Sequence, residues 1–92
     1  MKFPVAIKPG HATQAWGVVV PDLPGCFSAS DMGFDEAIIW AHEAIEMWIE
    51  TTLEMGQVIP KPSDITRVQK LKEFKGWKWA MVEVKPWQKN EI

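Results

Sequence analysis

The sequence predicts a small α+β domain, with a mainly antiparallel sheet packed on one long helix. Apolar and polar residues alternate over residues 2–8, the period of a strand with one buried face. From Phe34 to Met55 the apolar period changes to three and four, which is typical of an amphipathic helix. A chain of 92 residues can build only one core. We therefore expect a single domain over residues 1–92 in the order β-β-β-α-β.

The first two strands are expected to form a hairpin. Phe3, Val5 and Ile7 share one face of the first strand, and Pro9-Gly10 marks the turn that follows it. Pro4 has no N–H to donate, which predicts an edge position or a strand start. Residues 16–20 form a β-branched run and should pair antiparallel with the first strand.

A rigid turn should separate the second and third strands. Pro21-Asp22-Leu23-Pro24-Gly25 contains two prolines with fixed φ and one glycine, so a strand ladder must break there. Residues 26–29 are apolar or small, and we expect them to return as a short third strand that ends at Ser30-Asp31.

The long helix has signals at both ends. Gly33 is an acceptable N-cap, Asp35 and Glu36 favour the positive end of the helix dipole, and Gly56 is expected to stop the helix. The expected buried stripe consists of Phe34, Ala37, Ile38, Ala41, Ile45, Trp48, Ile49, Thr52 and Met55.

A short helix and one more strand complete the domain. Ser63-Asp64 can cap a helical turn that runs to about Lys70, and residues 72–76 are expected to form a charged loop. In residues 77–84, Trp79 and Met81 fall on one side and Ala80 and Val82 on the other. Apolar residues on both sides predict a central strand.

Composition excludes several classes of protein. Cys26 is the only cysteine, so no internal disulfide can form, and a reducing cytoplasmic location is expected. One thiol and two histidines are too few for a structural zinc site. The apolar run over residues 15–21 is too short to span a membrane, and no membrane association is expected.

The net charge of −2 conceals a split along the chain. Residues 1–56 carry two lysines against eight carboxylates, whereas residues 57–92 carry eight basic and four acidic residues. An acidic first half repels phosphate and attracts basic partners, although solvated faces without function produce the same pattern.

No catalytic, metal or cofactor site is expected. The possible nucleophile Cys26 has no histidine near it in sequence, and a buried structural thiol is the favoured interpretation. His42 and Glu46 are four residues apart on the helix, which favours a surface pair over a metal site. For two-metal nuclease chemistry, the strands offer only Glu83, with Asp22 in a turn.

The six tryptophans divide into core and surface candidates. Trp16, Trp48 and Trp79 fall on predicted buried faces. Trp40 and Met47 lie off the buried stripe of the helix, where they either anchor an interface or are covered by a loop. Lysines near Trp77, Trp79 and Trp87 would also suit nucleic-acid binding, but glutamates interrupt them.

Several motifs in order along the chain resemble the HicB antitoxin family. They are Met1-Lys2-Phe3-Pro4-Val5, the run from Val20 to Ser28 around Pro-Asp-Leu-Pro-Gly, Asp35-Glu36-Ala37, Glu54-Met55-Gly56, Ile59-Pro60-Lys61-Pro62-Ser63 and the run from Gly76 to Val84. Together they cover most of the chain, which makes the resemblance specific. One departure is Ser30-Asp31-Met32-Gly33, where the hydroxyl cap usual in the family is missing or displaced.

This resemblance implies a degenerate, partial RNase H-like fold without nuclease activity. It also implies a partner, a small basic HicA-like toxin that cleaves RNA, and assembly into a homo-oligomer. Family members commonly carry a further C-terminal DNA-binding domain, which we expect this chain to lack, so no specific DNA binding is expected of the chain alone.

We predict that the toxin binds the outer face of the long helix, which combines acidic and apolar side chains. The residues assigned to this contact are Trp40, Glu43, Glu46, Met47, Glu50 and Glu54, supported by Asp22 if its turn lies nearby. Two alternatives stay open: a fragment of a transcriptional autoregulator, and an orphan domain with an oligomerisation or ligand-binding role.

Overall fold

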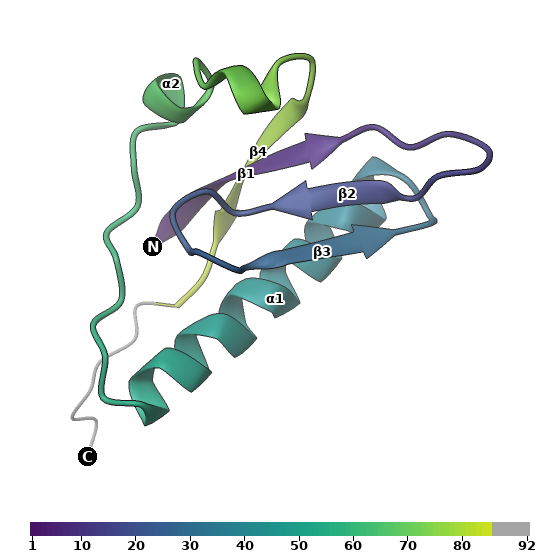
Figure 1. Cartoon of the computed structure of the whole chain (residues 1–92). Helices are drawn as coiled ribbons and strands as arrows, with labels where there is room; N and C mark the ends of the chain where they lie inside the picture. The colour runs from purple at the N-terminus through teal and green to yellow at the C-terminus, as the bar shows by residue number, and fades with distance from the viewer. Residues whose placement is uncertain (86–92) are drawn as a thin grey trace.

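Four antiparallel strands form one sheet in the order β3-β2-β1-β4, and a long helix covers one of its faces (Figure 1). This computed structural model describes residues 1–85. The elements are β1 (Lys2–Lys8), β2 (Trp16–Val19), β3 (Phe27–Ser30), α1 (Phe34–Glu54), α2 (Ile65–Val68), the 3-10 helix η1 (Lys72–Phe74) and β4 (Lys78–Glu83). The predicted α+β class and the predicted order of the elements are confirmed.

Of the two positions expected from Pro4, the edge position was wrong, because β1 lies inside the sheet between β2 and β4. Met1 and Val84 exchange two backbone hydrogen bonds of 2.8 and 2.9 Å, and alternation along β1 then directs the nitrogen of Pro4 toward the β2 side. The β2 ladder pairs only Ala6–Lys8, so it ends before reaching Pro4. Proline is tolerated here because no donor is required on that side.

The position expected for the last strand was also wrong, because β4 is an edge strand. As predicted, apolar side chains lie on both of its faces. Val82 faces the helix side of the sheet opposite Phe3, whereas Trp79 lies on the other face, where Phe74 of η1 packs edge-on against its ring at 5.5 Å. β4 can carry apolar side chains on both faces because η1 covers Trp79, and a second neighbouring strand is not needed.

Helix α1 follows the predicted boundaries to within one residue. Gly33 precedes it without a side-chain cap, because the nearest hydroxyl, Ser30 Oγ, accepts from Met32 N instead. At the other end Gly56 has φ +74°, and Gly56 N and Gln57 N donate to Leu53 O and Thr52 O. This reversal closes the helix by satisfying its last carbonyl groups.

The core lies between α1 and the sheet. Its fully enclosed side chains come from both layers, and they are Phe3, Val5, Ile7, Val18, Val20, Leu23, Cys26, Ala37, Ala41, Ile45, Ile49, Val82 and Val84. α1 packs chiefly against β3 and β2. The opposite face of α1 does not pack against the sheet.

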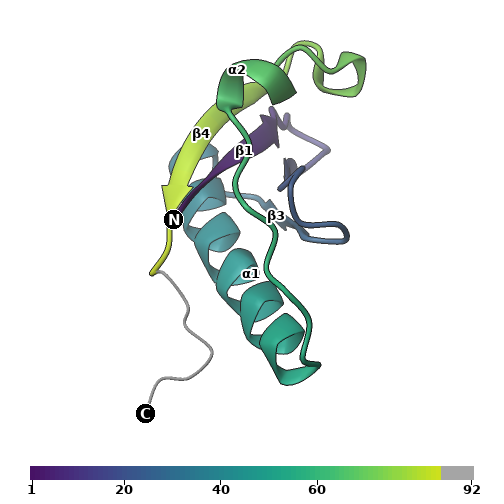
Figure 2. The same cartoon turned by 90° about the vertical axis from the view of Figure 1, so that its left-hand side faces the viewer.

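The segment between α1 and α2 runs along the molecule from the C-terminal end of α1 to α2 at the opposite end (Figure 2). Asp64 caps α2, because its side chain accepts from Thr66 N at 3.1 Å. This helix is shorter than expected, ending at Val68, and part of the expected charged loop is η1. No helix within residues 1–85 has the length and apolarity needed to cross a membrane.

Candidate protein-interaction surface

The outer face of α1 carries four glutamates, Glu43, Glu46, Glu50 and Glu54, which we call the acidic row. Spacings of three and four residues bring them onto one side of the helix. Three of them, together with Met47 and Lys85, line a shallow depression beside the end of β4. The structure thus brings most of the predicted contact residues together on one face.

Three large apolar side chains accompany the acidic row. Ile39, which the sequence reasoning did not single out, is 55% exposed, Trp40 is 41% exposed and Met47 is 66% exposed. Of the two interpretations left open for Trp40 and Met47, a covering loop is not found within residues 1–85. Met47 also lines a groove on the other side of the helix, formed with Phe27 at the edge of β3 and with Trp48. The outer face therefore has an acidic side toward β4 and an apolar side toward β3.

His42 and Glu46 form the predicted surface pair, with 3.6 Å between His42 Nδ1 and a Glu46 carboxylate oxygen. Both side chains are substantially exposed. Within the described part of the chain, no group of three or more histidine, cysteine, aspartate or glutamate side chains could hold a metal ion.

Asp22 is tied into the fold. Its Oδ2 accepts from Ser63 N at 2.7 Å, and its Oδ1 accepts from the Ser63 hydroxyl at 2.5 Å. These bonds join the turn after β2 to the connection that leads to α2. Asp22 uses both carboxylate oxygens in this way, so it is less available to a partner than the exposed carboxylates of the acidic row, of which Glu46 pairs with His42.

The same turn is fixed on α1 by Trp48, whose Nε1 donates to Pro24 O at 2.9 Å. Gly25 has φ +81° and follows Pro24, the arrangement of a type II turn, and Cys26 N donates to Leu23 O. The Pro-Asp-Leu-Pro-Gly motif is therefore a structural clamp between the sheet and the helix.

Cys26 is buried at the end of this turn, as predicted for a structural thiol. Desolvation raises its pKa to about 11. The thiol is therefore protonated at neutral pH and is a weak nucleophile.

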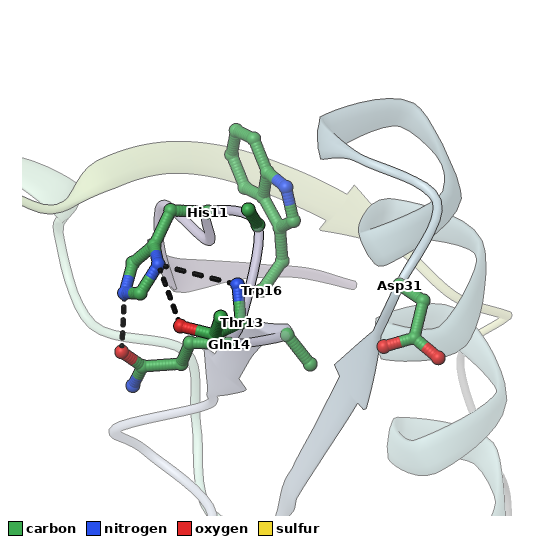
Figure 3. A pocket seen from close by; sticks show the side chains of 7 residues that line it. His11, Thr13, Gln14, Trp16 and Asp31 are labelled. Carbon is green, nitrogen blue, oxygen red and sulfur yellow. Dashed lines mark hydrogen bonds between the residues drawn. The ribbon is translucent and has the colours of Figure 1, made fainter.

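A polar hollow at the tip of the β1–β2 hairpin was not anticipated from the sequence (Figure 3). His11 contacts Gln14 Oε1 through Nε2 at 3.0 Å and Thr13 Oγ1 through Nδ1 at 3.3 Å. Asp31 lines the other side of the hollow from the β3–α1 connection. Since both ring nitrogens have local partners, His11 and Asp31 do not form an acid–base pair.

The basic residues in the second half of the described chain lie mainly in and around α2 and η1. Trp77 and Trp79 both pack edge-on against Phe74, at 5.1 and 5.5 Å. Their rings therefore contribute to a small apolar cluster, which weakens the nucleic-acid interpretation. Trp87, the third tryptophan of that interpretation, lies outside the described residues.

The chain is similar to proteins of one family. Residues 3–91 match the model described as HicB_like antitoxin of bacterial toxin-antitoxin system. An uncharacterized 14.9 kDa protein from the rep-hol intergenic region of Haemophilus phage HP1 is 37% identical over 84 residues, which make up 91% of this chain and 61% of the phage protein. This chain thus spans less than two thirds of that relative.

Solved structures agree with this match. The N-terminal domain of the Burkholderia pseudomallei antitoxin HicB is 36% identical, with a TM-score of 0.78 over 94% of this chain and all of that one. The longer HicB structure of the same organism gives 32% identity and a TM-score of 0.81, over all of this chain and 74% of that one. A chain of the HicA3 and HicB3 toxin-antitoxin complex is 30% identical, with a TM-score of 0.72, over 94% of this chain and all of that one.

Proposed function

The chain belongs to the HicB-like antitoxin family, and we propose that it binds and neutralises a small basic HicA-type toxin that cleaves RNA. A solved complex of HicA3 with the similar protein HicB3 supports a partner of this class. We place the activity in the cytoplasm, where the single Cys26 would stay reduced.

The main support is the combination of the acidic row with the exposed apolar side chains Ile39, Trp40 and Met47 on one helix face. A surface that holds RNA is cationic, because it must neutralise phosphate. Glutamates at spacings of three and four residues can occupy the positions of successive phosphates on such a surface. The toxin would then lose access to RNA while its charge is neutralised.

We assign different roles to the apolar and acidic groups. Trp40 would supply the affinity, because an aromatic anchor that is desolvated on binding typically dominates an interface. Met47 would pack beside it. Glu43, Glu46, Glu50 and Glu54 would mainly accelerate association through electrostatic attraction. Asp22 would act indirectly by holding its turn against Ser63.

The experiment is a kinetic binding series with the product of any small basic reading frame that adjoins the gene. Wild type, Trp40→Ala and a Glu43/Glu46/Glu50→Lys variant are compared at two salt concentrations. Trp40→Ala should weaken binding by about 2 kcal/mol or more, roughly thirtyfold, through faster dissociation. The charge reversal should slow association, and its effect should shrink at high salt.

Two matched controls identify the surface. Met32→Ala removes another exposed apolar side chain, and Asp31/Glu73/Glu83→Lys makes the same change in net charge elsewhere. Both controls should bind the toxin like wild type. Equal effects of the two charge reversals would remove the assignment to α1, and a wild-type chain that binds no such toxin would overturn the antitoxin function itself.

A further inference from the structure

A hollow beside η1 and the start of β4, which we call the basic hollow, combines positive charge with apolar surface. Three lysines and no carboxylate take part in its lining, and they are Lys70, Lys72 and Lys75. The other side chains that line it are mostly apolar, and they are Gln69, Leu71, Phe74, Trp77 and Trp79. The basic hollow lies near α2, at the opposite end of the molecule from the C-terminal end of α1 (Figure 2).

Backbone hydrogen bonds hold the walls of the basic hollow in place. Phe74 N and Trp77 N close two successive turns by donating to Leu71 O and Phe74 O, at 3.1 and 3.0 Å. The buried ring of Phe74 then packs edge-on against both Trp77 and Trp79. A partner that binds here meets a surface that is already formed, which lowers the entropic cost of binding.

The positive charge of the basic hollow is not neutralised by neighbouring carboxylates. Its three lysines are exposed, and no salt bridge from them to an aspartate or glutamate is found within residues 1–85. Arg67 and Lys78, which flank the hollow in sequence, are also exposed. Over residues 65–78 the only acidic residue is Glu73, which does not line the hollow. Like charges gathered in this way repel one another and attract an anionic partner.

We propose that the basic hollow binds an acidic peptide segment of another protein, a partner distinct from the proposed toxin. Carboxylates of this segment pair with the lysines, and an aliphatic or aromatic side chain between them covers Leu71, which is 41% exposed. Burial of apolar surface supplies affinity, and the charge pairs orient the segment and accelerate its association. A basic toxin is repelled at this surface, so the inference does not depend on toxin binding.

The aromatic side chains favour a peptide over nucleic acid as the partner. Proteins that hold single strands by stacking present open ring faces to the bases. Trp77 and Trp79 are only partly exposed, and both pack against Phe74. A phosphate group also has no apolar surface to place on Leu71, whereas a peptide can carry carboxylates and apolar side chains next to each other. The combination of lysines with apolar surface therefore fits an acidic peptide better.

The experiment measures the binding of fluorescein-labelled peptides to the full chain by fluorescence anisotropy. The probe is a peptide of Glu-Glu-Leu repeats, and two matched peptides carry glutamine in place of the glutamates or serine in place of the leucines. Wild type should bind the Glu-Glu-Leu peptide, and most tightly at low salt. Each replacement should weaken binding at least about fivefold, because it removes either the charge pairs or the apolar contact.

A pair of lysine variants locates the site. Lys72/Lys75→Gln should weaken binding of the Glu-Glu-Leu peptide at least about fivefold, because two ion pairs are lost. Lys2/Lys8→Gln makes the same change in net charge at two other exposed lysines and should bind like wild type. All four side chains are exposed, so both variants should keep the circular dichroism spectrum of wild type. Equal binding by the two variants would overturn the proposal.

A second comparison tests the apolar part of the surface and the class of partner. Leu71→Ala should weaken binding of the peptide, whereas Met32→Ala, which removes another exposed apolar side chain, should not. A thymidine oligonucleotide is the alternative probe. If it binds wild type as tightly as the peptide and loses affinity in Lys72/Lys75→Gln, the surface binds nucleic acid and the proposal fails. A wild-type chain that does not bind the Glu-Glu-Leu peptide would also overturn it.

Discussion

The inner and outer faces of α1 differ, because packing against the sheet determines the residues of the inner face but not those of the outer face. On the inner face, Ala37, Ala41, Ile45 and Ile49 are completely buried, and their sizes are set by the space between helix and sheet. On the outer face, Trp40 and Met47 are exposed beside the acidic row. Met47 gains little from folding, because most of its surface stays in water, and Trp40 also keeps 41% of its surface exposed.

The acidic row also opposes the stability of its own helix. Glu46 lies four residues from Glu50, which lies four residues from Glu54, and such like-charged neighbours repel. The last turn has no basic residue, so the carboxylates near the negative end of the helix dipole are uncompensated there. The inner face therefore maintains the fold, while the composition of the outer face is consistent with the binding role that we propose for it.

The largest effect on stability is expected at the inner face. Ile45→Ala should lower the free energy of unfolding by about 2–5 kcal/mol, because a completely buried side chain is replaced by a cavity. Met47→Ala, two residues along, should change it by less than about 0.5 kcal/mol. Urea denaturation of both variants measures the difference, and equal losses would show that Met47 is packed in solution.

A smaller contrast is expected between two tryptophans of α1. Trp48→Phe keeps an aromatic ring but loses the hydrogen bond to Pro24 O, and the free energy of unfolding should fall by about 1 kcal/mol. Trp40→Phe should change stability by less than about 0.5 kcal/mol, since phenylalanine keeps an aromatic ring and 41% of the Trp40 surface is already exposed. If both variants lose the same stability in urea, Trp48 does not hold the turn as described.

The sequence predicted most of the fold because its local signals agree with one another. The period change at Phe34 and the stop at Gly56 located α1 to within one residue. Strand order was less accessible. Pro4 was expected at an edge or at a strand start because proline lacks a donor, and it lies near the start of an inner strand, beyond the end of the β2 ladder. Whether a particular N–H needs a partner depends on register, which the local sequence does not determine.

The candidate surface was predicted only in part, because local patterns identify some of its residues and long-range contacts determine the others. Helical periodicity is a local property, so it identified Trp40 and Met47 as outward-facing. The bonds from Ser63 to Asp22 join residues 41 positions apart, and only the folded chain reveals them. The groove with Phe27 likewise requires knowledge of which strand lies next to α1.

The smallest expected effect has the opposite sign to the others. Glu54→Lys removes a like-charge repulsion with Glu50 and places a cation near the negative end of the helix dipole, so it should raise the free energy of unfolding by about 0.3–1 kcal/mol. In the proposed antitoxin role the same change should slow association with a basic toxin. Urea denaturation and binding kinetics at low salt measure the two quantities, with Glu83→Lys on β4 as the control for net charge. A variant that is more stable but associates more slowly would show that Glu54 serves binding against the stability of the helix. If Glu54→Lys destabilises the chain, Glu54 supports the fold instead, and the contrast between the two faces of α1 fails at that position.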